Sequence, residues 1–529
     1  MGRLDHGARM ARGLPWHAAV KRRRSPAPPI TFGHPADVLC RALGRTEGRA
    51  EDRIEIREGH MQKRLFAAAT MIALLSGCMV GPNYKRPPVT APDAFRAVPA
   101  PAPAPDARSI ADLKWFEVFS DEQLQELIRT ALAQNYDLRV AVARVDAARA
   151  NLGITKSYQY PNVGAGVGYT SVQASRNGLI SNPSGDRQSN VGTVSLDLFP
   201  YEIDLWGRLR RATEAARADL LAMDWNRKAV VTTLVSDVAI AYFNLLELDM
   251  ELAIAKSTLA TREQSRRLIQ LQEQAGIALL VDLRQAEQLV YGAAQTIPSA
   301  EQQIEQTENQ ISLLLGENPG PVKRGRLLTE QQTAPSVPAG LPSSLLERRP
   351  DIQAAEQNLI AANANIGVAK AAYFPQISLT GQLGYSSSSL SSLFSGASGI
   401  WSFLPRLVQP IFTAGRTKKG VALAEAQQRS ALAEYEHAIQ SAFRDVSDAL
   451  VAYKKVREVR AQRELLVKAV QDRKRLAYRR YEGGVDTMLN ALNSDQDLFT
   501  AEVSLAQARL DELRSLVELY RALGGGWDA

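Results

Sequence analysis

Residue types that commonly do covalent or acid–base chemistry are scarce in this chain. It has two cysteines and five histidines among 529 residues. Four histidines and Cys40 lie within residues 1–60, which leaves His437 and Cys78 for the rest. These residues lack the spacings of a Cys/His metal cluster and of a Ser-His-Asp or Cys-His pair, and no glycine-rich phosphate loop opens a helix. The sequence therefore predicts a protein that is not an enzyme and holds no metal or other cofactor.

The cysteine with a recognisable context is Cys78. After Met61, a positive Lys63-Arg64 pair precedes an apolar run, 65–75, that is too short to span a bilayer. The run ends in Leu75-Ser76-Gly77-Cys78, which resembles a bacterial lipobox, where diacylglycerol alkylates the thiol and the leader is cut before it. An ordinary signal peptide with an incidental cysteine is the weaker alternative. We expect a lipoprotein signal peptide at 61–77 and a lipid anchor on Cys78, because several acyl chains anchor stably.

The positive charge of the chain lies almost entirely in this N-terminal region. Residues 1–60 carry 12 Lys and Arg against 7 Asp and Glu, and residues 61–77 add two cations, which together account for the formal charge of +7. The remainder is neutral and shows no sign of a nucleic-acid partner. We interpret residues 1–60, rich in Arg and Pro, as a mis-assigned N-terminal extension.

The rest of the chain contains one unit twice. Asn135-Tyr136-Asp137-Leu138 matches Arg349-Pro350-Asp351-Ile352 at an offset of 214, whereas from Gly207-Arg208 and Gly415-Arg416 onward the offset is 208. One insertion or deletion between Pro161 and Gly207 accounts for both offsets. We divide the chain into a lipidated N-terminal segment (78–120) that packs on an equatorial belt, a first unit (121–316), a linker (317–348), a second unit (349–524) and a tail (525–529).

Each unit begins with a helical pattern and continues with alternating strands. A single amphipathic helix is expected over 121–157, with an apolar face of Leu124, Leu127, Ile128, Leu132, Leu138 and Val142. Strands follow, in which apolar and polar or glycine residues alternate; the apolar sets are Val163, Ala165, Val167 and Tyr169, then Ile377, Leu379, Leu383 and Tyr385. Polar loops at 174–190 and 386–399 lead to return strands at Val194-Leu196-Leu198 and at Trp401-Phe403, the latter ending near Pro405. Such strands fit a transmembrane β-barrel better than a pair of soluble hairpins.

A very long helix follows the strands of each unit. No proline or glycine interrupts the chain from Arg208 to Ala275, which at about 1.5 Å per residue gives roughly 100 Å of helix. Its apolar residues advance by 3 and 4 in turn, a period that demands coiled-coil packing: Val231, Leu234, Val238, Ala241, Leu245, Leu248 and Leu252, repeated as Ile439, Ala442, Val446, Ala449, Tyr453 and Val456. Glycine-containing turns at 275–278 and 483–485 reverse the chain, and return helices run to Leu315 and Leu523.

The strand count predicts an oligomer. Four strands per chain leave two bare edges, and every backbone group that faces lipid must be paired. Two copies would close eight strands and three would close twelve; the strands alone do not choose between a dimer and a trimer.

Together these features resemble the TolC/OprM-type outer-membrane efflux factors, especially the lipoproteins that serve resistance-nodulation-division pumps. The resemblance covers nearly all of 78–527 and is most specific in the strings 78–87, 341–352 and 410–416. It implies a trimer with a twelve-stranded barrel and a twelve-helix periplasmic tube, anchored in outer-membrane lipid. It also implies an equatorial belt at 319–348 and the chain ends, and docking onto a periplasmic adaptor bound to an inner-membrane pump.

The resemblance assigns roles to the two helix turns. Gly276 and Ile277 in the first turn, with Gly484 and Val485 in the second, are similar to the family's paired motifs that the adaptor grips. Glycine eases a chain reversal and lets another backbone approach closely. A plain turn would explain the glycines equally well, so the adaptor contact rests on the resemblance.

Gate positions lie just beyond these turns. Asp282 matches a family acidic residue that latches the closed tube, with Arg284 nearby. The second copy has Asn490 and Asn493 where the family commonly has Asp, which puts an acidic ring in doubt, although Asp486 and Asp495 are close in sequence. Carboxylates in a ring would bind cations and repel one another, whereas amides would not. We therefore expect a closed state held by hydrogen bonds and Asp282–Arg pairs, and Asp486, Asp495 and Arg284 as further charges or merely solvated tip residues.

The expected function is a passive exit duct for small molecules such as drugs or toxic compounds, driven by an inner-membrane pump through a periplasmic adaptor. A type I protein-secretion channel would use the same architecture. A structural cell-envelope coiled-coil lipoprotein without a pore would require the alternating strands to be soluble.

Overall fold

The structure is a computed structural model that describes residues 79–89, 110–175, 187–331 and 345–527. Every described residue belongs to the part of the chain Met71–Ala529. The expected N-terminal extension, signal peptide and lipidated Cys78 lie outside the described residues, as do residues 341–344 of one family string.

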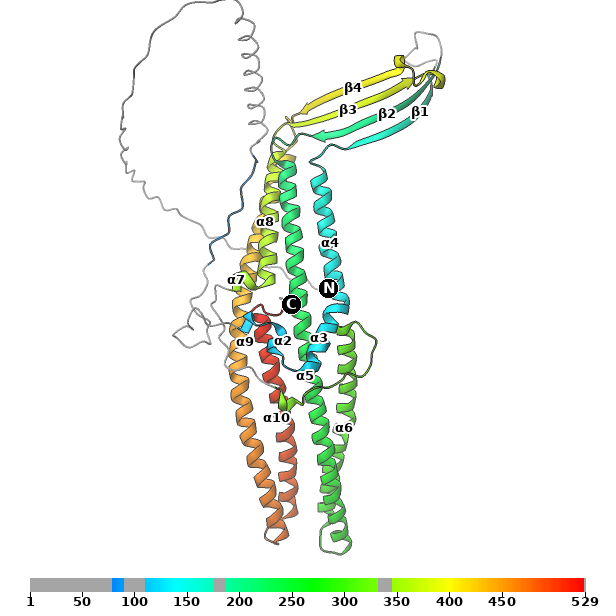
Figure 1. The fold of residues 1–529 in the computed structure, drawn as a ribbon. Coiled ribbons are helices and arrows are strands. Elements are labelled where there is room, and N and C mark those ends of the chain that lie inside the picture. Colours follow the sequence, from blue (N-terminus) through cyan, green and yellow to red (C-terminus); the bar gives the residue numbers. More distant parts are fainter. Residues whose placement is uncertain (1–78, 90–109, 176–186, 332–344, 528–529) are drawn as a thin grey trace, which may run out of the picture. The chain divides into compact units, whose positions relative to one another are not determined.

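The long helices and strands occur in the same order twice (Figure 1). The two leading helices each have 22 residues and the two longest helices each have 67. These matched lengths confirm the duplicated unit. The first set is α4 (Tyr136–Ser157), β1 (Val163–Gln173), β2 (Gln188–Glu202), α5 (Arg208–Gln274) and α6 (Leu280–Leu315); the second is α8 (Pro350–Ala371), β3 (Gln376–Ser387), β4 (Gly399–Val408), α9 (Arg416–Glu482) and α10 (Met488–Ala522).

The units differ most in the second strand of each hairpin, where β2 has 15 residues and β4 has 10. The length difference between the units therefore lies mainly in that strand. β4 also runs beyond the expected end near Pro405, which lies inside the strand, opposite Leu379. Proline is tolerated there because β4 is an edge strand within the protomer.

The expected single helix over 121–157 is wrong. The chain forms α3 (Glu122–Gln134) and α4, separated by Asn135. The Asn135 side chain accepts a hydrogen bond from the Leu138 N–H at 2.9 Å and donates to the Leu314 carbonyl at 2.9 Å, so it caps α4 and ties it to the end of α6. The break also changes the inward face: Ala141 and Val145 are buried in α4, whereas the expected Val142 is 44% exposed.

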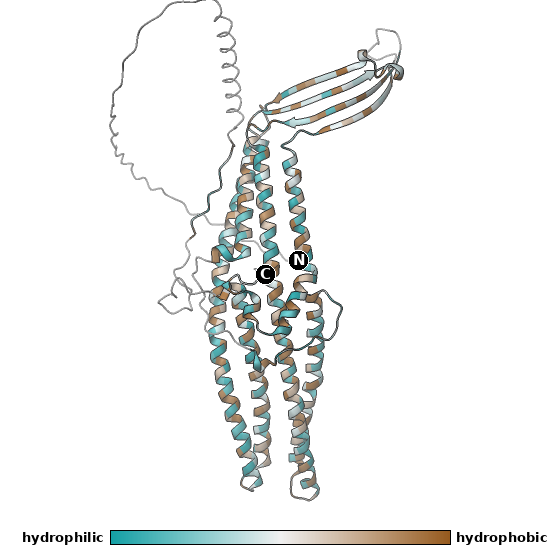
Figure 2. Ribbon diagram, in the orientation of Figure 1, coloured by the Kyte–Doolittle hydropathy of each residue, from teal (hydrophilic) through white to brown (hydrophobic). Residues whose placement is uncertain are grey.

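The four strands form one antiparallel sheet in the order β1-β2-β3-β4, which leaves β1 and β4 as its edges. Register partners share one face, so side chains line up in rows across all four strands. One row is Ala165, Leu196, Leu383 and Trp401; the adjacent row, on the opposite face, is Gly164, Asp197, Gln382 and Ser402. The expected alternation is confirmed, and Figure 2 shows it along the strands.

The apolar rows of the sheet are exposed within the protomer. Leu196, Leu383 and Trp401 are 54%, 62% and 79% exposed. A contiguous apolar surface of this kind on an isolated chain signals an apolar neighbour rather than water.

The expected coiled-coil seams are buried, except for Leu252 and Val456 at their ends, which are half-buried. Val238 and Leu245 of α5 and Val446 of α9 are fully covered, and α5 packs against α4, α6, α8 and α10. One stretch of α5 is apolar and long enough to cross a bilayer, but 67% of it is buried inside the protein, so it is the centre of the core. That core also takes in α2 (Trp115–Val118) and the start of α7 (Leu345–Arg348).

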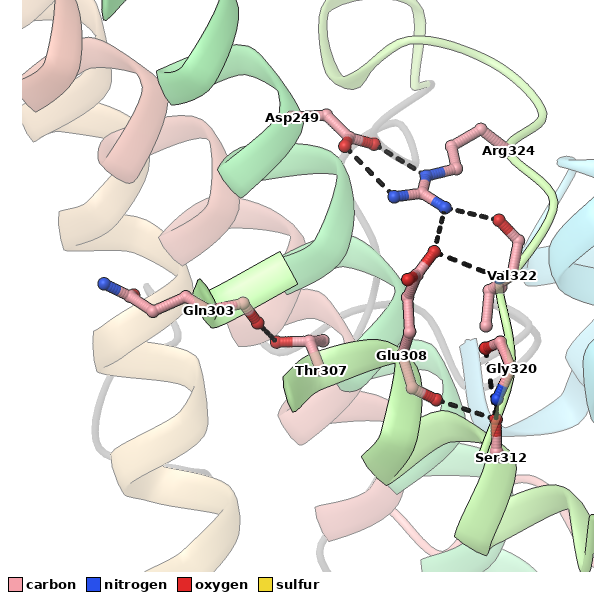
Figure 3. Close-up of polar contacts among 8 residues, drawn as sticks. All are labelled: Asp249, Gln303, Thr307, Glu308, Ser312, Gly320, Val322 and Arg324. Carbon is pink, nitrogen blue, oxygen red and sulfur yellow. Dashed lines mark hydrogen bonds and ion pairs between the residues drawn. The ribbon is translucent and has the colours of Figure 1, made fainter. Parts of the chain in front are cut away.

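The segment after α6 is fixed to the core by Arg324 (Figure 3). Its Nε donates to Asp249 Oδ2 of α5 at 2.9 Å, and its Nη1 binds Glu308 of α6. Glu308 also accepts the Val322 N–H at 3.1 Å. The guanidinium therefore joins the two helices of the first hairpin to the linker that follows them.

One buried carboxyl group makes the core sensitive to pH. Burial, with smaller contributions from Glu251 and Asp511, raises the pKa of Glu247 to about 7. Since this folded-state pKa exceeds that of an unfolded Glu, the folded state loses stability as pH rises from about 4.5 to about 7. We expect Glu247→Gln to stabilise the protein by on the order of 3 kcal/mol at pH 8 and by little at pH 4, measured by thermal unfolding at both pH values. Equal shifts at both would contradict the assignment.

Candidate functional site

Both helix turns end the long helices with the same hydrogen bonds. In the first, Gly276 has φ +73°, its N–H donates to the Glu273 carbonyl at 2.9 Å, and the Ile277 N–H donates to the Gln272 carbonyl at 2.8 Å. This is a Schellman cap, which favours glycine at the left-handed position.

The second turn repeats the arrangement. Gly484 has φ +70°, and the Val485 N–H donates to the Arg480 carbonyl at 3.0 Å. Sequence spacing therefore located both turns correctly.

The two turns present apolar side chains to solvent. Ile277 is 77% exposed and Val485 is 65% exposed. A Cβ added at Gly276 or Gly484 would meet nothing within 4 Å. Glycine is therefore needed at these positions for the positive φ of the turn and not for a close contact inside the protomer. Within the described residues, two exposed apolar tips with open space beside them are suited to receive another protein.

The two helical hairpins touch near these tips. The Tyr481 hydroxyl of α9 donates to Gln272 Oε1 of α5 at 2.9 Å. An apolar cluster draws on three helices, α5, α6 and α10: Ile269, Leu283, Ala286, Met488, Ala491 and Leu492. The gate positions identified from the sequence lie on the helices that make this contact.

The first-copy gate residues engage their own helix. Asp282 Oδ2 accepts the Leu279 N–H at 3.3 Å, which caps the start of α6, and Arg284 pairs with Glu287 at 2.7 Å. Among the contacts found for the described protomer, Asp282 has no arginine partner. The expected Asp282–Arg pair would therefore require a second subunit.

The second-copy gate residues form a short polar network. The Asn490 amide donates to Asp486 Oδ1 at 2.6 Å, and Arg480 pairs with Asp486 at 3.1 Å. The hydrogen bond from Asn490, that from the Thr487 N–H, and Arg480 lower the pKa of Asp486. Asn490 and Asn493 are exposed on α10. Arg480 therefore partly neutralises the charge of Asp486.

Asp495 is not a solvated tip residue, which corrects the sequence-based expectation. It is 3% exposed, and its carboxylate pairs with Arg262 of α5 at 2.7 Å and with Lys474 of α9 at 2.5 Å. Helical spacing carried a signal for this burial, since Asp495 lies on the inner face of α10 with Met488, Ala491 and Leu492.

Arg262 joins helices from both hairpins. Besides Asp495, its guanidinium donates to the Leu289 carbonyl of α6 at 2.9 Å and to Gln496 Oε1 of α10 at 3.0 Å, and it lies over the Phe499 ring. Sequence reasoning missed this residue because nothing in its neighbourhood within α5 distinguishes it from other arginines there.

These features define the class of protein. Each of its two units combines a strand hairpin, which has an apolar and a polar face, with a long helix hairpin that ends in an exposed apolar tip and has buried charges behind it. The chain belongs to the outer membrane efflux protein family, whose sequence model matches residues 127–317 and 341–525. The first match covers most of the first unit, and the second begins in the linker and covers the whole second unit.

Relatives and solved structures agree with this assignment. The chain is 39% identical over 473 residues to the probable efflux pump outer membrane protein TtgC of Pseudomonas putida, covering 88% of this chain and 96% of the relative. It is 38% identical over 480 residues to outer membrane protein OprJ of Pseudomonas aeruginosa, covering 88% and 97%. The crystal structure of the open state of the Neisseria gonorrhoeae MtrE outer membrane channel aligns with a TM-score of 0.77 at 33% identity, covering 85% of this chain and 99% of that one.

Proposed function

We propose that the chain is the outer-membrane channel of a tripartite efflux system, a passive exit duct for small molecules without enzymatic activity. An inner-membrane pump supplies the energy, and a periplasmic adaptor connects that pump to the tips at Gly276–Ile277 and Gly484–Val485. The relative TtgC, a probable efflux pump outer membrane protein, supports this role, as do the exposed apolar tips.

The sheet is the observation that carries the proposal. An apolar row (Ala165, Leu196, Leu383 and Trp401) lies next to a polar row on the opposite face (Gly164, Asp197, Gln382 and Ser402) across all four strands, as expected for a wall with lipid outside and water inside. Because β1 and β4 are edges, the wall closes only when copies join, and we propose a trimer with twelve strands and twelve long helices.

A deletion strain tests the role in the cell. We expect loss of the protein to increase susceptibility to several unrelated toxic compounds, with recovery when the chain is restored. Unchanged susceptibility together with loss of a secreted protein would instead favour a type I secretion channel.

The lipid anchor on Cys78 is part of the proposal. We expect intact-mass analysis of the native protein to show a chain that begins at Cys78 with diacylglycerol and a third acyl chain, and no peptide from residues 1–60. A recovered peptide from that region would contradict the assignment of the start.

A neutral constriction follows from the amides at the second gate. Because Asn490 and Asn493 carry no charge and Asp486 is paired with Arg480, we expect weak block by trivalent cations in planar-bilayer recordings. Asn493→Asp should introduce a carboxylate from each subunit and strengthen the block by about tenfold or more. Strong block of the unaltered channel that persists in Asn490→Ala would contradict a neutral constriction.

A further inference from the structure

The first described segment, which we call the N-terminal strap (79–89), docks along helices of both units. It begins where strands meet helices: the Val80 N–H donates at 3.0 Å to the carbonyl of Trp206, just before α5. The Trp206 indole in turn donates to the carbonyl of Pro375, just before β3, at 2.8 Å. The strap therefore begins at the junction of sheet and helices.

A fully buried arginine holds the start of the strap. Arg211 of α5 is 1% exposed. Its Nη2 donates to Asn83 Oδ1 at 2.7 Å and to the Gly81 carbonyl at 3.3 Å, and its Nε donates to the Val80 carbonyl at 3.4 Å. Glu214 balances the charge at 2.7 Å. One buried guanidinium therefore makes hydrogen bonds to Val80, Gly81 and Asn83 of the eleven-residue strap, which indicates a specific binding site for the strap.

The strap then runs along α8 in an extended form. The Asn363 amide donates to the Pro82 carbonyl at 3.0 Å, and Glu356 accepts from the Tyr84 hydroxyl at 3.0 Å and pairs with Arg86 at 2.7 Å. From Gly81 to Arg86 an extended chain advances about 17 Å, and from Gly367 to Glu356 a helix rises about 16 Å. The strap and α8 therefore cover nearly the same length, so successive strap residues meet successive turns of the helix.

Two glycines allow the close approach at the top of this path. A Cβ at Gly81, which has φ +101°, would lie 2.5 Å from the Gly367 Cα. A Cβ at Gly367 would lie 2.8 Å from both the Val80 oxygen and Arg211 Cγ. Neither glycine tolerates a side chain while the strap is docked.

The duplication provides an internal comparison. Each residue that holds the strap is replaced, at the corresponding position of the unit to which it does not belong, by a residue that is exposed or has open space beside it within the protomer. Three of the replacements are exposed: Lys419 for Arg211, Val142 for Glu356, and Arg149 for Asn363. The fourth is Gly153 for Gly367, where an added Cβ would meet nothing within 4 Å. Within the described part of the chain, the binding site for the strap therefore occurs once, as expected if it serves the single N-terminus of the chain.

We propose that Arg211 and Glu356 are positioning residues that dock the N-terminal strap and thereby fix the lipid-bearing end of the chain at the sheet–helix junction. This inference rests on the proposed acylation of Cys78 for its role in the membrane, whereas the docking itself does not. Acylation supplies the affinity for the membrane, and the docked strap sets the position of the channel relative to its lipid anchor.

Limited trypsin digestion of the full-length native protein in detergent tests the docking. The Lys85-Arg86 bond lies within the strap, and its cleavage releases a small N-terminal peptide for mass spectrometry. Losing one hydrogen bond to a buried charge is expected to raise the open population about tenfold or more, so Arg211→Ala and Glu356→Ala should speed this cleavage by at least that factor. Cleavage after Arg480 at the α9 tip, measured in the same digest, should keep its rate.

Matched substitutions at the corresponding positions, Lys419→Ala and Val142→Ala, should leave the strap cleavage rate unchanged. If Arg211→Ala does not accumulate, Asn83→Ala removes a partner of the guanidinium from the strap side and should speed cleavage in the same way. Equal strap cleavage in all these variants, or a parallel rise at the α9 tip, would overturn the proposal. The mass of the released peptide separately reports whether Cys78 is acylated, so failure of the lipid anchor and failure of the docking give different results.

Discussion

Asp495→Ala is expected to loosen the helix tips more than any other single substitution behind them. The change leaves the Arg262 guanidinium, 3% exposed, without its carboxylate partner, and breaking a buried ion pair typically costs about 3–5 kcal/mol. Lys474, which is more exposed, can turn to solvent and lose less. We expect faster amide exchange at the ends of α5, α6, α9 and α10, with little change near the sheet, measured by hydrogen exchange with mass spectrometry.

The neighbouring pair between Asp497 and Arg473 provides the control. Both side chains are about half exposed, so Asp497→Ala should cost less than about 1 kcal/mol. A combined Arg262→Met and Asp495→Leu variant removes both buried charges and should regain most of the lost protection. Equal exchange in Asp495→Ala and Asp497→Ala would show that the buried pair does not hold the tips together.

The second large effect is expected at the tips themselves. Ile277→Asp combined with Val485→Asp places charges where an adaptor would bury apolar side chains, and each such contact is worth about 2 kcal/mol or more at an interface. Because both side chains are largely exposed, folding and oligomer formation should be unchanged. We expect drug susceptibility to rise to the level of the deletion strain, while the purified channel conducts normally.

Leu390→Asp is the matched control for the tips. Leu390 is 71% exposed but lies in the connection between β3 and β4, far along the chain from either helix turn. Its substitution should leave susceptibility unchanged. If the tip variant supports full resistance, the adaptor does not grip these residues.

The sequence predicted those parts of the fold that depend on period and repetition. Alternation in Val163–Gln173 and Gln376–Ser387 identified strands with two different faces, and spacing by 3 and 4 identified the buried residues of α5 and α9. These signals are strong because many residues repeat the same burial pattern over a long distance. The glycines of the turns were equally legible, since a left-handed position restricts the residue type.

Features that depend on one residue meeting a distant partner were missed. Asn135 divides the predicted helix because its side chain reaches both the next turn and the end of α6. Arg262 and Arg211 look like ordinary helix arginines in the sequence, yet each is buried among segments far away in the chain. The spacing of apolar residues within one helix or strand does not reveal such contacts, because they depend on how the elements pack.

The residues at the predicted gate positions show the same limit. The sequence identified Asn490 and Asn493 as departures from an acidic pattern, and the structure places Asn490 in a network with Asp486 and Arg480. It also moves Asp495 from the solvated surface to the interior, where it joins the two hairpins. Spacing alone gave the position of these residues but not their partners.

Closure of the sheet between subunits is the central claim, and disulfide formation across its edges tests it most directly. Within a protomer β1 and β4 are separated by β2 and β3, so they lie about 14 Å apart, beyond the reach of a disulfide. Val167→Cys in β1, combined in turn with cysteines along β4, should yield covalent trimers on a non-reducing gel for at least one register. If every register gave only monomers, from a protein that stays soluble and monomeric without detergent, the result would contradict the claim that subunits join to close a channel.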